Sequence, residues 1–278
     1  MVIAINYADE KFRTAQKFNS KTAVKTGGVD RVEECGTASL DEAFRQKNHE
    51  ILNVARGAGL WLWKPYIIRK ALMQAGDGDY IVYTDAGCAF VNNVSYLIES
   101  MNAEQTDVMV FCIEHLERKY TKRDAFILMD CDSPEYSDTP QICGGYIVLR
   151  KTEFSCGFVD EWLNFAQDKR IITDDENVMG KTNYEGFVEN RHDQSILSLL
   201  CKKKGIRPFR DPSEYGLKQK LFSPEVCGRS KYPQIFESHR NPNCRSIWQL
   251  GYYNKLYKGM TALRIYIGKK KRALLEGR

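Results

Sequence analysis

One acidic residue directly follows the most strand-like segment of the chain. Residues 80–84 are β-branched and aromatic, and Asp85-Ala86-Gly87 comes next. Ligands of open α/β sheets bind beyond the carboxyl ends of the strands. A carboxylate there could hold a divalent cation, which prefers oxygen ligands, and small neighbours would let a ligand approach the backbone. The alternative is a turn aspartate that caps its own backbone, because turns often contain Asp-x-Gly.

Two further polar clusters could also bind an anion. His192-Asp193-Gln194 opens an apolar helical segment, and the free N–H groups of a helix N-terminus favour a phosphate. A simple N-cap role for the aspartate is the alternative. His239-Arg240 lies in a loop-like region, where the histidine could bind a metal or carry a proton and the arginine could pair with phosphate. Such a pair is otherwise an ordinary surface feature.

Lys64 stands among aromatic residues at the start of a predicted helix. Residues 61–66 hold two of the four tryptophans, and Lys64-Pro65 suits a first helical turn. The aromatic residues indicate packing. A partly buried ammonium needs an anionic partner, and Arg56 could share its task. The glycines at 57 and 59 lack the strand and helix context of a phosphate-binding fingerprint.

Short apolar strands alternate with helices around these residues. This alternation predicts a single α/β domain whose sheet is covered by helices on both faces. Strands are expected at residues 2–6, 80–84, 108–113 and 144–149, and helices at 9–19, 41–56, from 64 onward, 94–101, 154–166 and 193–204.

Composition indicates a soluble globular protein. Of its 278 residues, 43% are apolar and 28% charged, and no apolar run approaches the 18 residues of a membrane-spanning helix. No secretory signal is visible at the start, and the nine cysteines form no Cys-x-x-Cys pair. We therefore expect reduced thiols in a cytoplasmic protein.

The net charge of +5 is concentrated at the C-terminal end. Residues 251–278 carry eight basic residues and one acid, which leaves 33 basic and 35 acidic residues in the first 250. A near-neutral body argues against nucleic-acid binding over the whole surface. The aromatic and basic tail could lie on an anionic membrane, on the inner face of the cell membrane, or pack as a helix with a solvated basic end.

Five segments, taken in order along the chain, resemble the GT-A class of nucleotide-sugar-dependent glycosyltransferases. The likeness is greatest to bacterial capsule and lipopolysaccharide transferases and weaker to the family 8 galactosyltransferase and glycogenin group. It implies a GT-A-like, Rossmann-type mixed sheet flanked by helices, with a catalytic domain at residues 1–250 and a basic extension at 251–278. The segments are Gly59-Leu-Trp-Leu-Trp-Lys-Pro-Tyr66, Gly78-Asp-Tyr-Ile-Val-Tyr-Thr-Asp-Ala-Gly-Cys88, Gly144-Gly145, His192-Asp-Gln-Ser195 and Ser238-His-Arg240.

The resemblance also implies site residues. Asp85 matches the first acid of the Asp-x-Asp motif that binds Mn²⁺ or Mg²⁺ at the donor diphosphate, His239 matches the late metal ligand, and Gly87 replaces the second acid. Asp193 and Gln194 match the polar pair beside the donor sugar in retaining relatives, which makes them the catalytic candidates. The residues expected to contact the donor are Asn6, Tyr7, Arg56, Lys64, Thr84, Ala86, Gly87, Gly144, Gly145, His192 and Arg240.

The expected activity is sugar transfer from a nucleotide sugar, a UDP-sugar, to a saccharide or lipid-linked glycan. Two alternatives remain at this point. A nucleotidyltransferase would share strand-end acids and phosphate chemistry, but the first strand is not followed by a glycine-rich basic loop. A non-catalytic module would explain the altered Asp85-Ala86-Gly87 motif and would leave the tail as the binding element.

Overall fold

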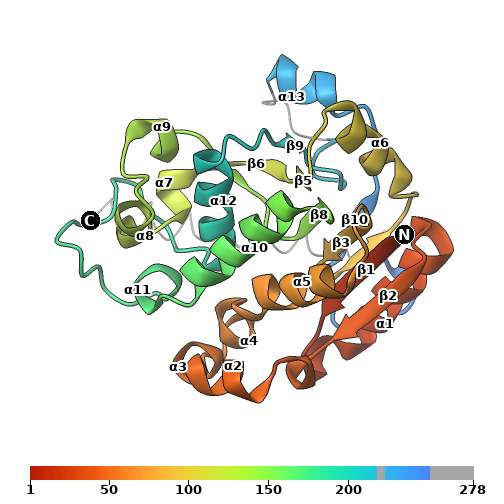
Figure 1. The fold of residues 1–278 in the computed structure, drawn as a ribbon, viewed down its shortest axis with the longest axis horizontal. Helices are drawn as coiled ribbons and strands as arrows, with labels where there is room; N and C mark the ends of the chain where they lie inside the picture. Colours follow the sequence, from red (N-terminus) through yellow and green to blue (C-terminus); the bar gives the residue numbers. More distant parts are fainter. Residues whose placement is uncertain (218–222, 251–278) are drawn as a thin grey trace, which may run out of the picture.

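A five-stranded mixed sheet forms the centre of the computed structural model, which describes residues 1–217 and 223–250 (Figure 1). Its strands are β1 (Val2–Tyr7), β2 (Arg31–Cys35), β3 (Tyr80–Thr84), β5 (Val108–Met109) and β8 (Tyr146–Arg150). They lie in the order β2-β1-β3-β8-β5. The β1 strand is parallel to β2 and β3, whereas β8 is antiparallel to β3 and β5.

Two smaller sheets extend this centre. One joins β4 (Cys88–Phe90) to β10 (Phe236–Ser238), and the other joins β6 (Phe111–Leu116) to β7 (Pro140–Ile142) and β9 (Phe209–Arg210). In the antiparallel β4–β10 pair, Ser238 stands opposite Cys88. This pairing brings the chain after β10 beside the turn after β3, although the two are some 150 residues apart in the sequence.

Helices cover both faces of the central sheet. Figure 1 shows α5 and α10 side by side over one face, and α6 packs on the other. The helices are α1 (Arg13–Thr22), α2 (Glu42–Lys47), α3 (His49–Leu52), α4 (Gly57–Leu60), α5 (Trp63–Gln74), α6 (Ser95–Ala103), α7 (Glu117–Tyr120), α8 (Arg123–Leu128), α9 (Pro134–Ser137), α10 (Glu153–Ala166), α11 (Lys169–Ile172), α12 (Asp193–Lys203) and α13 (Pro224–Arg229), with short 3₁₀ turns at Glu10–Phe12 and Thr37–Ser39 and a π-helical turn at Ala23–Gly27.

Alternating side chains along the strands divide the interior into two cores. Ile3 and Ile5 of β1 face the core beneath α5 and α10, whereas Ala4 between them faces the core beneath α6. Tyr83 and Val82 of β3 divide in the same way. A sheet that buries both faces needs helices on both sides. The predicted α/β architecture, a mixed sheet flanked by helices, is confirmed.

The predicted helix at residues 41–56 is wrong in its second half. Asn48, with φ −113° and ψ 21°, separates α2 from α3. Residues 57–61 all have positive φ, including Ala58, Leu60 and Trp61, and form a left-handed turn before α5. L-residues adopt this conformation only at a cost, and apolar periodicity does not encode it. The predicted strand at 108–113 is also divided, because β5 and β6 belong to different sheets.

The predicted extension, residues 251–278, lies outside the described residues. Within residues 1–217 and 223–250, the apolar helices are all too short to cross a membrane.

Candidate functional site

The peptide groups of Gly144 and Gly145, just before β8, connect three of the predicted site residues. The carbonyl oxygen of Gly144 accepts a hydrogen bond from Lys64 Nζ (2.8 Å), and its N–H donates to Gln194 Oε1 (2.9 Å). The N–H of Asp85 donates to the carbonyl oxygen of Gly145 (3.0 Å). The start of α5, the start of α12 and the end of β3 therefore meet at these two glycines.

Neighbouring side chains pack against both glycines, and closely at Gly144. A Cβ atom on Gly144 would lie 3.0 Å from Cβ of Gln194, and one on Gly145 would lie 3.4 Å from Oδ2 of Asp85. The sequence predicted small residues that let a ligand approach the backbone. In the structure, the side chains of Gln194 and Asp85 lie against these two glycines.

Lys64 is a buried ammonium group between two carboxylates. Its side chain is 3% exposed, and Nζ lies 2.6 Å from Oδ2 of Asp193 and 3.7 Å from Oδ1 of Asp85. Burial lowers the pKa of Lys64, but the charges of Asp193 and Asp85 outweigh that effect and raise it overall. Lys64 therefore stays charged, and it acts as an internal counter-ion instead of an exposed ligand contact.

The two catalytic candidates have different surroundings. The side chain of Asp193 is only 3% exposed, and burial raises its pKa to about 6 against the opposing effect of Lys64. Gln194 is half-buried and stands beside Gly144. The structure thus places Asp193 behind the site as the partner of Lys64, and Gln194 is the member of the pair that a ligand can reach.

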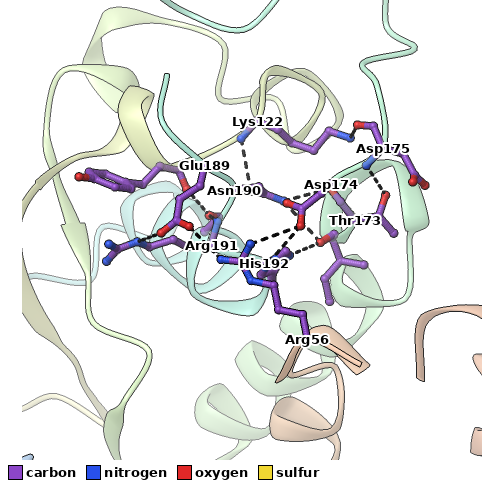
Figure 2. Close-up of polar contacts among 12 residues, drawn as sticks. Arg56, Lys122, Thr173, Asp174, Asp175, Glu189, Asn190, Arg191 and His192 are labelled. Atoms are coloured by element: carbon purple, nitrogen blue, oxygen red, sulfur yellow. Dashed lines mark hydrogen bonds and ion pairs between the residues drawn. The ribbon is translucent and has the colours of Figure 1, made fainter. Parts of the chain in front are cut away.

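A separate charged cluster lies around His192, the residue before α12 (Figure 2). Arg56 is 44% exposed and pairs with Glu189 (2.9 Å) and Asp174 (3.5 Å). His192 is buried, and its Nδ1–H donates to the carbonyl oxygen of Ile172 (2.8 Å). The predicted donor contacts Arg56 and His192 therefore belong to this cluster and are not among the residues that converge on the two glycines.

The backbone of His192 is strained. Its φ of 54° and ψ of −117° lie outside the regions that L-residues favour. The ring stacks near Trp61, with centroids 5.7 Å apart, and Trp61 itself has positive φ. Strain of this kind persists only where the surrounding contacts enforce it. Here it determines how α12 starts, and hence where Asp193 and Gln194 are placed.

A buried amide network supports the end of β3. Asn6 Nδ2 donates to Asn19 Oδ1 (2.7 Å), and Asn19 Nδ2 donates to Thr84 Oγ1 (2.9 Å). Gln16 Nε2 donates to Asn6 Oδ1 (2.9 Å). Asn6 and Thr84 were predicted to contact the donor, but both are buried and their side chains hydrogen-bond to other residues of the protein. Gln16 and Asn19 were not predicted as site residues, although their i, i+3 spacing places both side chains on one face of α1.

Tyr7 lies at the wall of a cavity of about 460 Å³ between the end of β1 and helices α2 and α3. Its ring stacks on Trp63 with centroids 3.8 Å apart. Ile5 pairs with Tyr83, so Tyr7 stands at the same edge of the sheet as Asp85. The other lining residues are Thr37, Leu40, Glu42, Arg45, Gln46, His49, Leu52, Asn53 and Ala58.

The turn after β3 is packed against the chain that follows β10. The carbonyl oxygen of Gly87 accepts hydrogen bonds from the N–H groups of His239 (3.0 Å) and Arg240 (2.9 Å). A Cβ atom on Gly87 would lie 3.2 Å from Cα of Arg240. The second acid of an Asp-x-Asp motif would therefore be crowded by this backbone. Ala86 is buried in the same turn.

Two possible metal ligands lie at this turn, Asp85 and His239. His239 is 1% exposed, its Nδ1 accepts the N–H of Asn241 (3.0 Å), and burial lowers its pKa to about 4. Asp85 Oδ1 accepts the hydroxyl of Tyr83 (2.6 Å). Nowhere in residues 1–217 and 223–250 do three His, Cys, Asp or Glu side chains gather as metal ligands do. Asp85 and His239 could therefore supply two protein ligands, and the donor phosphates or water would have to supply the rest of a Mn²⁺ or Mg²⁺ shell.

Arg240 supplies an exposed cation at the same turn. Its backbone has φ 52°, and its guanidinium carbon lies 5.8 Å from the centre of the Tyr215 ring. Of the predicted basic contacts, Lys64 is buried and Arg56 lies in the cluster around His192. Arg240 is therefore the predicted cation whose backbone packs against the turn that carries Asp85.

Comparison with known proteins gives structural matches alone. The chain matches no family model and no curated protein sequence. It is similar to the galactosyltransferase LgtC in complex with donor and acceptor sugar analogs, at 15% identity and a TM-score of 0.48 over 93% of this chain and 96% of that one. An active-site mutant of LgtC matches at 14% identity and a TM-score of 0.49, with the same coverage. Mouse xyloside xylosyltransferase 1 matches at 8% identity and a TM-score of 0.45, over 84% and 95% of the two chains. At such identities, activity has to be argued from the residues of the site.

Proposed function

We propose that this protein is a glycosyltransferase that moves a sugar from a nucleotide sugar, a UDP-sugar, to a saccharide or lipid-linked glycan. The observation that carries the proposal is the convergence of Lys64, Asp85 and Gln194 on Gly144–Gly145 at the carboxyl edge of β3. Ligands of α/β sheets bind at such an edge. The site combines an accessible amide, a half-exposed carboxylate and an adjacent exposed arginine.

The donor would lie across this edge. The cavity beside Tyr7 would accept the base and ribose, with the Tyr7 ring in its wall. Arg240 meets the diphosphate beside Gly87, and its guanidinium can bind phosphate oxygens in pairs. As the glycosidic bond breaks, this cation stabilises the negative charge that develops on the leaving nucleoside diphosphate.

The sugar would then lie over Gln194. Glycosyl transfer passes through an oxocarbenium-like state with positive charge at the anomeric carbon. The carbonyl oxygen of Gln194 and the carboxylate of Asp85 are the acceptor groups on this side of the site. Because His192-Asp193-Gln194 resembles the corresponding segment of retaining relatives, retention of configuration is the outcome we propose. Asp193 holds Lys64 in place and acts through it.

The resemblance is weakest at the residues expected to bind a divalent metal. Asp85 and His239 would supply two protein ligands, and a Cβ atom at residue 87 would lie 3.2 Å from Arg240 Cα. No step is assigned to Mn²⁺ or Mg²⁺ on these residues. Turnover after EDTA treatment, and again after each ion is added back, measures how far the reaction depends on either one.

The basic tail would locate the enzyme near its acceptor. Residues 251–278 carry a net charge of +7 and alternate aromatic with basic residues. We propose that they bind an anionic membrane surface on its cytoplasmic side, where lipid-linked glycans are available. Flotation with liposomes containing anionic lipid, with and without residues 251–278, tests this proposal. Equal flotation of both proteins would contradict it.

A donor screen tests the proposed activity. The purified chain is incubated with a panel of nucleotide sugars, and products are identified by mass. Release of a nucleoside diphosphate together with a glycosylated acceptor or free sugar is the expected result. Pyrophosphate release from a nucleoside triphosphate would indicate a nucleotidyltransferase instead. If the chain neither binds nor turns over any donor, the proposed activity is wrong and the chain is a non-catalytic module.

A further inference from the structure

Gln194 is the last member of a chain of buried amides that starts at a carboxylate. We propose that Glu117 and Gln141 are positioning residues that fix the side-chain amide of Gln194, so that its carbonyl oxygen faces the donor sugar. This inference rests on the proposed function. We call these three residues the amide relay.

The relay links three elements that are distant in sequence. Glu117 starts α7, Gln141 lies in β7, and Gln194 lies in the first turn of α12. Gln141 Nε2 donates to Glu117 Oε1 (3.0 Å), and Gln194 Nε2 donates to Gln141 Oε1 (2.8 Å). At the far end, Gln194 Oε1 accepts the N–H of Gly144 (2.9 Å). Every bond along the relay thus has one donor and one acceptor.

The two ends of the relay determine its direction. An ionised carboxylate only accepts hydrogen bonds, so the NH₂ group of Gln141 must face Glu117. The oxygen of Gln141 then faces Gln194 and requires the NH₂ group of that residue. The backbone N–H of Gly144 only donates, so it requires the oxygen of Gln194. The carboxylate and the peptide group therefore specify the same orientation of both amides.

Glu117 is held firmly enough to act as this reference point. Its side chain is fully buried, and Oε2 accepts hydrogen bonds from Lys202 Nζ and Ser198 Oγ. The hydroxyl of Thr121 donates to Oε1. These donors hold the carboxylate of Glu117 in place. Gln141, also fully buried, has further acceptors for its NH₂ group in Thr121 and the carbonyl oxygen of Tyr120.

The orientation matters for the chemical step more than for donor binding. With its oxygen toward the site, Gln194 directs the negative end of a dipole at an oxocarbenium-like sugar. A flipped amide would present its NH₂ group there and oppose the developing positive charge. Loss of the relay should therefore lower kcat and leave KM for the donor nearly unchanged.

Gln141→Met, a near-isosteric change that cannot hydrogen-bond to Gln194, tests the inference. We expect kcat to fall about tenfold or more, with KM for the nucleotide sugar within about twofold of wild type. Gln167→Met is the matched control, because it removes another half-buried amide, whose bonds to Asn48 and to the carbonyl oxygen of Leu163 lie outside the relay. It should lower stability and keep kcat within about twofold. Thermal unfolding of each variant verifies the fold.

A double-mutant cycle separates positioning from general damage. In a Gln194→Ala background, Gln141→Met should cause no further loss of kcat, because the residue through which it acts is absent. An unchanged kcat in the single variant, or a full additional loss in the double variant, would overturn the inference. If Gln141→Met does not fold, Thr121→Val removes one anchor of Gln141 and should lower kcat about two- to threefold in the same cycle. A wild-type chain without any donor turnover would instead remove the proposed function.

Discussion

Two groups in this molecule have the same charges but different surroundings. The Lys64 group (Lys64, Asp85 and Asp193) and the Arg56 group (Arg56, Asp174 and Glu189) each consist of one cation and two carboxylates. The cation of the first is 3% exposed, whereas that of the second is 44% exposed. Exposed ion pairs contribute little to stability, whereas removal of one partner from a buried pair is costly. Burial should therefore decide which group the protein depends on.

Lys64→Met should have the largest effect. It leaves Asp193 buried without its counter-ion, so we expect a loss of about 3–5 kcal/mol in the free energy of unfolding. Donor turnover should fall on the order of a hundredfold, because Asp85 and Gly144 both lose their shared partner. Urea denaturation and donor turnover measure the two effects.

A second substitution distinguishes the two effects of Lys64. Lys64→Met combined with Asp193→Leu removes both buried charges, which should restore most of the stability but none of the activity. Recovery of full activity in the double variant would show that the Lys64 group serves only the fold.

Gly144→Ala should have the next largest effect. The added Cβ would lie 3.0 Å from Cβ of Gln194 and would push the start of α12 away from β8. We expect donor turnover to fall about tenfold and stability by about 1–3 kcal/mol. Gly157→Ala is the control, because no atom lies within 4 Å of its added Cβ and alanine favours helix α10. Equal activity losses in the two variants would argue against close packing at Gly144 as the cause.

The pH profile tests the charge state of Asp193. Burial raises the pKa of this carboxyl from its ordinary 3.8 to about 6. It therefore takes up a proton as the pH falls through about 6 and then no longer pairs as an anion with Lys64. We expect turnover to fall about tenfold for each pH unit below that value. Asp193→Asn should have low activity without this acid limb, and an identical limb in the variant would assign it to another group.

The same pKa has an opposite consequence for stability. Between pH 4 and 6 the folded protein retains the proton of Asp193 while the unfolded chain releases it. The contribution of this one group to stability therefore decreases as the pH rises through that window. It is largest at acidic pH, where turnover is lowest.

Arg56→Met should have the smallest effect. Arg56 pairs with Asp174 and Glu189 at the surface, so its loss should change stability by less than about 1 kcal/mol. Donor turnover should remain within about twofold of wild type. A hundredfold loss, comparable to that of Lys64→Met, would mean that both charged groups serve the reaction.

Local pattern was sufficient to predict the elements that build the site. The β-branched run before Asp85 predicted β3 to the residue, and the apolar helix after Gln194 is α12. Both are buried elements, and the periodicity of their apolar residues indicates which face is buried. Strand β2, in contrast, has the sequence Arg-Val-Glu-Glu-Cys and was missed, because an edge strand of this composition has no apolar alternation.

The sequence pattern did not predict contacts between segments that are distant in the chain. The sequence identified Lys64, Asp85, Gly144 and Gln194 separately, but not that the peptide groups of two glycines would join them. Glu117 and Gln141 were missed because a buried polar residue is identified only by the partners that the fold brings to it. The burial of Asp193 behind Lys64 is likewise a property of packing and not of spacing.

We propose that the half-buried amide of Gln194, held at Gly144, serves sugar transfer. The most direct measurement is the rate of nucleoside diphosphate release from the best donor of the panel, by wild type and by Gln194→Ala, at saturating donor. We expect measurable release by the wild type and a loss on the order of a hundredfold in a folded variant that still binds the donor. Equal rates in the two proteins, or no release from any nucleotide sugar, would contradict the claim.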